Sequence, residues 1–272
     1  MKTKQKLKIC ISISRAPSLF GTYFHNNLYK KYKINAFYKA LKIKTDQLKT
    51  VFDIVKENND VIGCSVSTPF KSKSIKYLSN LDFHSRKIRA INTVVNRNGS
   101  LVGYNTDFDS AFYAFKKLKI NKKNKILIIG SGSMAKVYIY LLKLLKFSNF
   151  KICSRKRISN ISSSNCIRFK VINNIVNNFD LIINCTTIGM KNNQKKIIFN
   201  YNNINKKSKV IDCVAIPVRT PLINYCIKNN ILNINGLELA YHQAVRQFKL
   251  YTNYNVPKIY KTEFMKFFAK QK

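Results

Sequence analysis

Hydrophobic residues follow two spacings along this chain. Short, nearly continuous apolar runs are typical of buried strands, and they occupy 7–13, 34–41, 60–67, 125–129, 149–154, 180–186 and 209–215. Between these runs, apolar residues recur at helical spacing. This spacing predicts helices over 21–32, 46–58, 71–79, 134–146, 220–229 and 238–253, and a further amphipathic helix that starts near Phe108. The chain therefore has the pattern of an α/β protein.

Two changes in this pattern divide the chain. The turn residues 96–99 separate the apolar runs 93–95 and 100–104, which predicts a hairpin. From Lys125 onward, strands and helices alternate, which predicts a parallel sheet with right-handed crossovers, although the polar stretch 156–178 places its elements only loosely. We therefore expect two domains. Residues 1–107 and the returning helices of 237–272 would form an α/β domain, and 108–236 a Rossmann-type nucleotide-binding domain.

The clearest local motif lies where the strand 125–129 ends. The residues that follow are Gly130, Ser131, Gly132, Ser133, Met134 and Ala135. A strand, a tight glycine turn and a helix N-terminus place backbone N–H groups and a helix dipole where a diphosphate binds. Gly130 allows the turn, Gly132 lets the diphosphate approach the backbone, and Ala135 stands where helix and strand pack closely. The motif predicts a dinucleotide site.

The end of the next strand indicates which dinucleotide. An NAD site places an acidic residue about 20 residues after the glycines, where it binds the ribose 2′-hydroxyl. Here the second strand ends in Ser154, Arg155 and Lys156, with nothing acidic nearby. A hydroxyl beside cations suits a 2′-phosphate, because arginine offers a planar pair of donors. Basic residues occur throughout this chain, so a basic cluster alone is weak evidence. Its position directly after the second strand is what favours NADP over NAD.

The charge of the chain is extreme. Its 272 residues include 50 Lys and Arg against 11 Asp and Glu, a formal net charge of +39. Such a charge is typical of nucleic-acid-binding proteins, but here the lysines are spread over the whole sequence instead of forming a stripe or tail. Lysine, Asn, Ile, Tyr and Phe are all encoded by A/T-rich codons, so compositional drift accounts for their abundance. We therefore expect no nucleic acid as primary partner, although the charge should steer small anions to the protein.

Cysteine usage and hydropathy bear on the compartment. The seven cysteines are scattered, without a CxxC pair or metal-ligand spacing, so we expect buried reduced thiols and no metal site. No apolar run approaches the ~18 residues of a membrane span. The short apolar stretch near the N-terminus contains serines and lacks a cleavage site. We expect a cytoplasmic protein without a membrane partner, and the sequence does not distinguish a monomer from a homodimer.

Two residues of the first domain are candidates for proton transfer, which nicotinamide chemistry on a hydroxyl or ketone requires. Lys71 follows a strand and stands at a predicted helix start, where the helix dipole favours its neutral form and makes it a usable acid/base. Asp107 precedes a predicted helix and could orient that lysine. Simpler interpretations stay open: Lys71 as one solvated lysine among many, and Asp107 as a helix N-cap.

Taken in order, the motifs resemble the shikimate dehydrogenase family, and the resemblance extends over nearly the whole chain. The matching segments are Val66–Lys71, Ile91–Val94, Asn105–Asp107, Gly130–Ala135, Ser154–Lys156, Asn184–Met190 and Gly236–Gln243. Each segment alone would be a weak signal, but several unrelated motifs in the family's order form a specific one.

The resemblance implies an activity and a role for each matched residue. The catalytic pair would be Lys71 and Asp107, and the substrate would be held by Ser67, Asn92, Asp107, Gln243 and Arg15. The cofactor NADP would be lined by Gly130, Ser131, Gly132, Ser133, Met134, Ala135, Ser154, Arg155, Lys156, Thr186, Met190 and Gly236. The implied reaction reduces 3-dehydroshikimate to shikimate with NADPH, in the pathway to chorismate and the aromatic amino acids.

The N-terminal loop departs from the family pattern. Two serines of the family grip the substrate carboxylate, and here Leu19 and Gly21 stand at their positions. The remaining candidates for that task are Ser12, Ser14, Arg15, Ser18 and Thr22. This loop and the segment 213–221 resemble the shikimate-dehydrogenase-like branch of the family. Two alternatives therefore stay open: a dehydrogenase of quinate or another shikimate-like acid, and a catalytically decayed NADP-binding relative.

Overall fold

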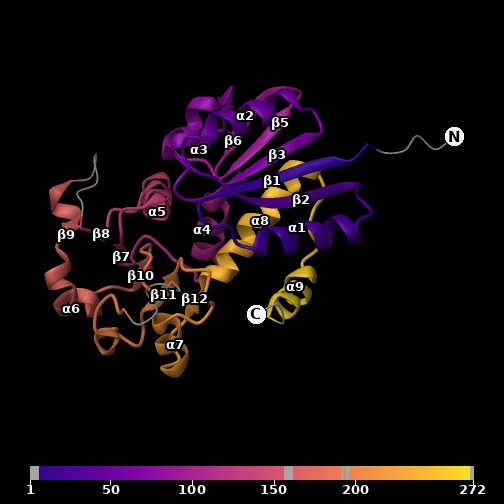
Figure 1. Cartoon of the computed structure of the whole chain (residues 1–272). Coiled ribbons are helices and arrows are strands. Elements are labelled where there is room, and N and C mark those ends of the chain that lie inside the picture. Colours follow the sequence, from indigo (N-terminus) through magenta and orange to yellow (C-terminus); the bar gives the residue numbers. More distant parts are fainter. Residues whose placement is uncertain (1–5, 156–161, 191–192, 194–195, 270–272) are drawn as a thin grey trace. The chain divides into compact units, whose positions relative to one another are not determined.

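The computed structural model describes residues 6–155, 162–190, 193 and 196–269 (Figure 1). It divides into two compact units: unit 1 comprises Met1–Thr106 and Gln243–Lys272, and unit 2 comprises Asp107–His242. Each unit contains one six-stranded sheet. None of the helices in these described residues is long and apolar enough to cross a membrane.

Unit 1 is built on a mixed sheet. Its strands are β1 (Lys8–Ser14), β2 (Ala36–Lys42), β3 (Val61–Val66), β4 (Asn80–Leu81), β5 (Thr93–Arg97) and β6 (Ser100–Tyr104). Its helices are α1 (Phe20–Lys31), α2 (Leu48–Glu57), α3 (Phe83–Ile88) and α9 (Tyr260–Ala269), the short 3₁₀ helix η1 (Lys73–Tyr77), and most of α8 (Gly236–Thr252). The strand order is β2-β1-β3-β5-β6-β4. The first three strands pair in parallel, whereas β5 is antiparallel to both of its neighbours.

The predicted hairpin connects β5 and β6. Arg97 pairs with Ser100, so Asn98 and Gly99 form a two-residue turn. Both turn residues have positive φ, 52° and 88°, as the tight hairpin turns that match strand twist require. The Asn96 side chain accepts a hydrogen bond from the Gly99 N–H at 2.8 Å and so closes the turn. This hairpin carries the chain from the segment 91–92 to the start of helix α4 (Thr106–Lys117), and both of these places matter for the site.

Helices cover both faces of the unit 1 sheet, with α1 and α2 on opposite sides (Figure 1). On the α2 side, Phe52 and Val55 belong to one buried apolar cluster with Ile13 of β1 and Val66 of β3. On the other side, the α1 residue Tyr29 donates a hydrogen bond to Cys10 of β1. Fully burying one large apolar side chain contributes about 1.5–3 kcal/mol, so these two layers hold the sheet edge that presents the site residues.

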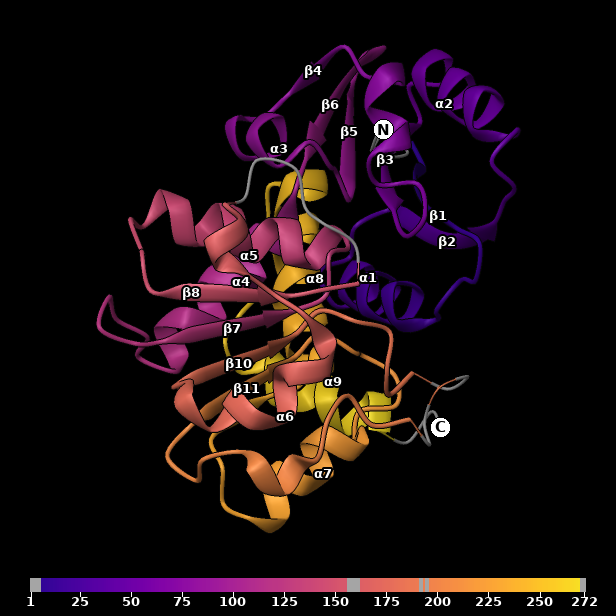
Figure 2. The same ribbon diagram turned by 90° about the vertical axis from the view of Figure 1, so that its left-hand side faces the viewer.

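Unit 2 is a parallel sheet. Its strands are β7 (Ile126–Ile129), β8 (Phe150–Cys153), β9 (Cys166–Ile167), β10 (Leu181–Asn184), β11 (Lys209–Asp212) and β12 (Asn233–Ile234). Its helices are α4 (Thr106–Lys117), α5 (Ser133–Leu144), α6 (Ile172–Ile175) and α7 (Pro221–Lys228), with the 3₁₀ turns η2 (Ser163–Asn165), η3 (Phe169–Val171), η4 (Val176–Asn178) and η6 (Tyr201–Asn203). Figure 2 shows α5 on one face of this sheet and α6 and α7 on the other.

The strand order of unit 2 is β12-β11-β10-β7-β8-β9, and every neighbouring pair runs parallel. Counted from β9, this is the order 3-2-1-4-5-6 of a doubly wound nucleotide-binding sheet. The predicted α/β fold with a Rossmann-type domain is therefore confirmed. The direction of winding changes between β7 and β10, and ligands of such sheets bind at the carboxyl ends of the strands at this point.

One predicted element is wrong in kind. The pattern predicts a helix over 71–79, but the structure forms only the five-residue 3₁₀ helix η1 and then turns into β4 and α3. The Asp82 carboxylate accepts hydrogen bonds from the backbone N–H groups of His84 and Ser85 and caps α3. Because a new helix starts after this aspartate, the helix predicted over 71–79 cannot continue past it. The short elements β4, α3, β9, β12 and α6 were not expected either.

Candidate functional site

The glycine turn of unit 2 lies at the switch point, directly after β7. Gly130 has a φ of 114°, and a Cβ there would lie 3.0 Å from the backbone carbonyl of Cys185, so only glycine fits. At Gly132, by contrast, a Cβ would have no atom within 4 Å. The open space at Gly132 adjoins the N-terminus of the twelve-residue helix α5. Exposed N–H groups and the positive helix end make this a suitable place for a phosphate group.

A cavity of about 1010 Å³ opens beside this turn. Five of the predicted cofactor residues line it, namely Gly130, Ser131, Gly132, Arg155 and Thr186. Its other described lining residues include Lys196 and no acidic side chain. A cavity of this volume, with two cations and a glycine turn, can hold an anionic dinucleotide.

The remaining predicted cofactor residues lie elsewhere in unit 2. Ser133 and Met134 form the first turn of α5, Ser154 follows β8, and Ala135 is fully buried. A Cβ on Gly236 would collide with the backbone of Val214, so the structure gives this glycine a packing role at the start of α8. The Met190 side chain is 45% exposed. Lys156 lies outside the described residues.

A buried polar network holds the segment after β10 in place. The Asn184 side-chain oxygen accepts hydrogen bonds from the N–H of Thr186 at 2.9 Å and from its hydroxyl at 2.7 Å. The Asn184 amide donates to Asp212 at 2.9 Å, and Thr220 donates to the same carboxylate. Burial raises the pKa of Asp212, while these hydrogen bonds oppose the shift. The sequence analysis missed Asp212, although an acidic residue at a strand end in so basic a chain was a usable signal.

In unit 1, two serine residues stand side by side at the carboxyl edge of the sheet. Ser14 ends β1 and Ser67 follows β3, and the Ser67 N–H donates to the carbonyl of Ile13 at 2.9 Å. The Ser14 hydroxyl is buried and has no hydrogen-bond partner among the described residues. Arg15, which follows it, is exposed. These groups can together bind an anion such as a carboxylate.

Lys71 lies in the turn between β3 and η1 and is half-buried. Its backbone carbonyl accepts a hydrogen bond from the N–H of Ile91 at 2.9 Å, which ties it to the residue before Asn92. The expected position at a helix start is wrong, because η1 begins at Lys73 and has only five residues. A helix dipole therefore gives no argument for a neutral Lys71.

The carboxamide of Asn92 is held in one orientation. The residue is 2% exposed. Its Oδ1 accepts hydrogen bonds from the Thr106 N–H at 2.8 Å, from the Thr106 hydroxyl at 3.1 Å and from the Thr93 hydroxyl at 3.0 Å. These three donors to one oxygen fix the orientation of the whole carboxamide, and Nδ2 is its donor end.

Gln247 supports this arrangement from α8. Its Nε2 donates to the Thr93 hydroxyl at 2.8 Å and to the backbone carbonyl of Asn92 at 3.1 Å. The sequence analysis missed Gln247. It lies four residues after Gln243 on the same helix and therefore on the same face, which was the available signal.

Asp107 is the second residue of α4 and is 6% exposed. The helix begins at Thr106, so Asp107 lies within its first turn, and the alternative interpretation of Asp107 as an N-cap is wrong. The Ser110 hydroxyl donates to its backbone carbonyl at 2.8 Å. Lys71, Asn92 and the half-buried Gln243 belong to unit 1, and Asp107 is the first residue of unit 2.

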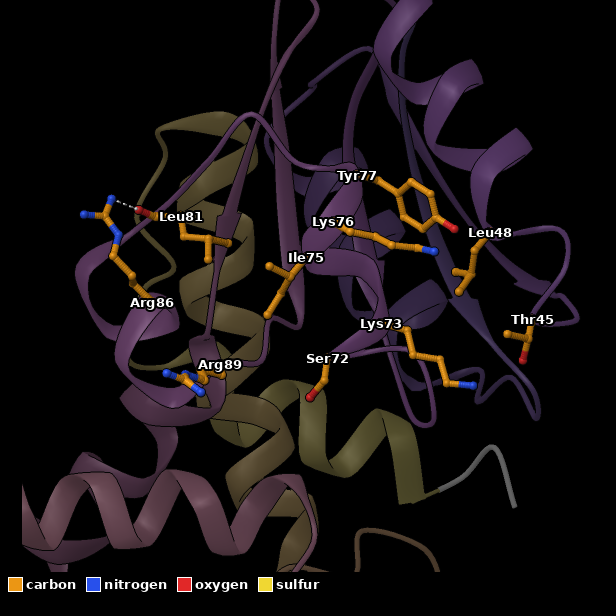
Figure 3. Close-up of a pocket in the computed structure, with 10 residues that line it drawn as sticks. All are labelled: Thr45, Leu48, Ser72, Lys73, Ile75, Lys76, Tyr77, Leu81, Arg86 and Arg89. Atoms are coloured by element: carbon orange, nitrogen blue, oxygen red, sulfur yellow. Dashed lines mark hydrogen bonds between the residues drawn. The ribbon is translucent and has the colours of Figure 1, made fainter. Parts of the chain in front are cut away.

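Unit 1 also has a separate cavity of about 690 Å³ (Figure 3). Its lining includes the cations Lys73, Lys76, Arg86 and Arg89. The Arg86 guanidinium donates to the carbonyl of Leu81 at 3.0 Å. None of the predicted site residues lines this cavity, so the candidate chemistry does not involve it.

Comparison with known proteins gives concordant results. The family model of the shikimate dehydrogenase substrate binding domain matches residues 11–94. The chain is 35% identical over 249 residues to the shikimate dehydrogenase-like protein of Haemophilus influenzae, covering 90% of this chain and 91% of that protein. It is 34% identical over 239 residues to the shikimate dehydrogenase (NADP(+)) of Clostridium botulinum, with coverage of 86% and 90%.

Among solved structures, a shikimate dehydrogenase in complex with NADP⁺ matches with a TM-score of 0.83 and 26% identity, covering 97% of this chain and 96% of that one. The expectation of an NADP-dependent oxidoreductase agrees with the names of these relatives and with the ligand of that structure. The motifs, the fold and these similarities together establish that the chain belongs to the shikimate dehydrogenase family.

Proposed function

We propose that this protein is an NADP-dependent shikimate dehydrogenase, which interconverts 3-dehydroshikimate and shikimate. The observation that carries the proposal is the fixed carboxamide of Asn92, whose oxygen is engaged by Thr93 and Thr106. Asn92 is thereby held in one orientation, as ordered binding of a substrate requires. Lys71 and Asp107 both adjoin this arrangement: Ile91 binds the Lys71 carbonyl, and Asp107 follows Thr106 in the chain.

Unit 2 would hold the cofactor. The diphosphate would lie against Gly132 and the N-terminus of α5, where a side chain would otherwise fill the space. The Arg155 guanidinium, which lines the same cavity, would bind the 2′-phosphate. Bound NADPH supplies a hydride. The protein's contribution is to position the two partners and to handle the accompanying proton.

Three residues would act at the reacting end of the substrate. Lys71 would donate a proton to the reacting oxygen in the reductive direction and accept it in the oxidative one. Asp107 is proposed as the second member of the catalytic pair. Asn92 would donate a hydrogen bond and fix the position of a neighbouring substrate hydroxyl. Gln243, on α8, is proposed as a further contact to the substrate hydroxyls.

The substrate carboxylate would be bound at the sheet edge formed by Ser14, Arg15 and Ser67. The support is the unpartnered buried hydroxyl of Ser14, next to the Ser67 backbone and followed by an exposed arginine. The serine positions of the family pattern hold Leu19 and Gly21 here. This altered loop favours a second candidate function, a dehydrogenase of the same family that acts on quinate or another shikimate-like acid.

The test is an assay of the purified protein with NADP⁺ and either shikimate or quinate, in which the absorbance of the reduced cofactor is followed. We expect turnover of shikimate, and loss of turnover in Lys71→Ala with NADP⁺ binding retained. Turnover of quinate alone would establish the second candidate. Binding of NADP⁺ without turnover of shikimate, quinate or a related hydroxylated acid would identify a decayed relative and refute both dehydrogenase proposals.

A further inference from the structure

Two cysteine residues lie beside each other at the carboxyl edge of the unit 2 sheet. Cys185 directly follows β10 and Cys213 directly follows β11, and the preceding residues Asn184 and Asp212 are paired in the parallel register. The two Sγ atoms are 3.9 Å apart. Both side chains are half-buried, whereas four other cysteines of the chain are buried.

The backbone at these positions suits a disulfide. Neighbouring strands lie about 4.8 Å apart, and disulfides join Cα atoms separated by about 4.4–6.8 Å. The Cys213 N–H also donates to the carbonyl of Asn184 at 2.9 Å, which keeps the two chains paired up to the cysteines. Bringing the sulfurs from 3.9 Å to a bonding distance of about 2.05 Å therefore needs side-chain rotation and no separation of the strands.

We propose that Cys185 and Cys213 are a thiol modification site, which closes to an intrachain disulfide by exchange with a low-molecular-weight disulfide. In the first step the Cys185 thiolate attacks the reagent disulfide, forms a mixed disulfide and releases one thiolate. In the second step Cys213 attacks the sulfur of Cys185, forms the intrachain bond and releases the second thiolate. The two protein thiols lose two electrons and two protons, and the reagent disulfide takes them up as two thiols.

The surroundings decide which cysteine attacks first. Cys185 lines the cavity beside the glycine turn, so a small disulfide can reach it from solvent. The neighbouring Cys185 and burial hold the pKa of Cys213 well above its usual range, so Cys213 stays protonated until a mixed disulfide forms next to it. Cys185 is therefore the attacking residue and Cys213 the resolving one.

The position of Cys185 connects this modification to the proposed cofactor site, and this step rests on the proposed function. The Cys185 N–H donates to the carbonyl of Ile129 at 2.8 Å, and its own carbonyl would lie 3.0 Å from a Cβ on Gly130. Because the backbone of Cys185 touches the glycine turn this closely, a rotation or shift at Cys185 is transmitted to Gly130. We expect the oxidised protein to bind NADP⁺ more weakly than the reduced protein.

The experiment treats the full chain with oxidised glutathione and maps the products by peptide mass spectrometry under non-reducing conditions. We expect a peptide pair joined through Cys185 and Cys213, which disappears on reduction. NADP⁺ affinity of the same samples should fall about tenfold on oxidation, a change equal to the loss of about one hydrogen bond, and recover on reduction. Cys213→Ser should stop at the mixed disulfide on Cys185, and the matched control Cys166→Ser should behave as the wild type.

Separate outcomes refute separate statements. If the mapping finds only glutathione adducts, or finds Cys185 joined to a cysteine other than Cys213, the modification site is wrong. If the joined peptide forms with unchanged NADP⁺ affinity, the link to the cofactor site is wrong. If the reduced protein does not bind NADP⁺ at all, the proposed function fails, and the mapping still decides on the disulfide. Should Cys213→Ser fail to fold, Cys185→Ser serves instead and should show neither adduct nor joined peptide.

Discussion

The Gln247 side chain donates a hydrogen bond to the Thr93 hydroxyl at 2.8 Å, and that hydroxyl in turn donates to Oδ1 of Asn92 at 3.0 Å. Gln247 lies on α8 and Thr93 lies on β5, and the two residues are 154 positions apart in the chain. Two elements that meet only in the folded state thus determine which end of the Asn92 carboxamide is presented. Gln247 is in this sense a positioning residue for Asn92.

Gln247→Ala should therefore impair substrate binding, although Gln247 is not one of the residues proposed to contact the substrate. The Thr93 hydroxyl loses its donor and becomes free to rotate away from Asn92, so we expect KM for shikimate to rise about tenfold, as for the loss of one hydrogen bond. KM for NADP⁺ should stay unchanged. Lys249→Ala, an exposed position on the same helix, is the matched control. A Gln247→Ala variant with reduced thermal stability but wild-type KM values would show that the residue is only structural.

Asn92→Asp tests the orientation itself. Aspartate keeps the oxygen that Thr93 and Thr106 bind, but it replaces the Nδ2 donor by an acceptor. We expect the loss of this donor, together with the added negative charge, to lower kcat/KM by about 10–100-fold, while the fold is retained. The steady-state rates and the far-UV circular dichroism spectrum check this. An unchanged kcat/KM would mean that the Nδ2 donor of Asn92 is not needed for substrate binding or turnover.

The two glycines of the turn should respond in opposite ways to alanine. Gly130 has positive φ and a crowded Cβ position, so Gly130→Ala should reduce the free energy of unfolding by about 1–3 kcal/mol. Gly132 has open space, so Gly132→Ala should fold with wild-type stability and lose NADP⁺ affinity by about tenfold or more, because the methyl group occupies the diphosphate position. Urea unfolding and cofactor titration separate the two effects. Wild-type affinity in Gly132→Ala would place the diphosphate elsewhere.

Much of unit 2 could be predicted because its signals are local. The run Ile126–Ile129, the glycine turn and the helix that follows are contiguous. The conformation of each depends mainly on residues that are close in sequence. The helix predicted to start at Lys71 is wrong for a related reason. Only the five-residue 3₁₀ helix η1 forms there, and Asp82 caps the new helix α3 a few residues later.

Long-range contacts could not be predicted in the same way. The hydrogen bonds of Gln247 and the contact of Cys185 with Cys213 depend on which strands are neighbours, and the order β10 next to β11 and α8 beside β5 is a property of the fold. Cys185 and Cys213 lie within the predicted strands 180–186 and 209–215, so a predicted strand order would have placed them together. The carboxylate-binding residues were left open between five candidates, and burial points to Ser14 among them.

Arg155→Ala tests the preference for NADP. Removing the guanidinium should raise KM for NADP⁺ by about 10–100-fold, as expected for lost charge-assisted hydrogen bonds, and change KM for NAD⁺ little. Arg168→Ala is the matched control, since Arg168 is an exposed arginine of unit 2 that does not line the cavity. Equal effects of Arg155→Ala on both cofactors would contradict the assignment of the 2′-phosphate to Arg155.

The stability of the protein should fall at mildly acidic pH through His25. This imidazole stacks on the ring of Tyr38, with centroids 4.4 Å apart, and burial lowers its pKa from 6.5 to about 3, against a smaller opposing effect of Gln247. Between these two values the unfolded chain binds a proton that the folded protein excludes. The free energy of unfolding contributed by neutral His25 is thus fully present above pH 6.5 and is lost as the pH falls from 6.5 towards 3, by about 1.4 kcal/mol per pH unit.

Urea unfolding at pH 7 and pH 5 measures this loss, which should reach about 2 kcal/mol from His25 alone. The carboxyl groups also contribute at low pH, so the comparison must be made with a variant that cannot titrate at this position. His25→Phe keeps an aromatic ring against Tyr38 and should remove about 2 kcal/mol of the pH dependence, whatever its stability at pH 7. If wild type and His25→Phe lose the same free energy between pH 7 and pH 5, the buried imidazole is protonated in the folded protein and its surroundings differ from those described.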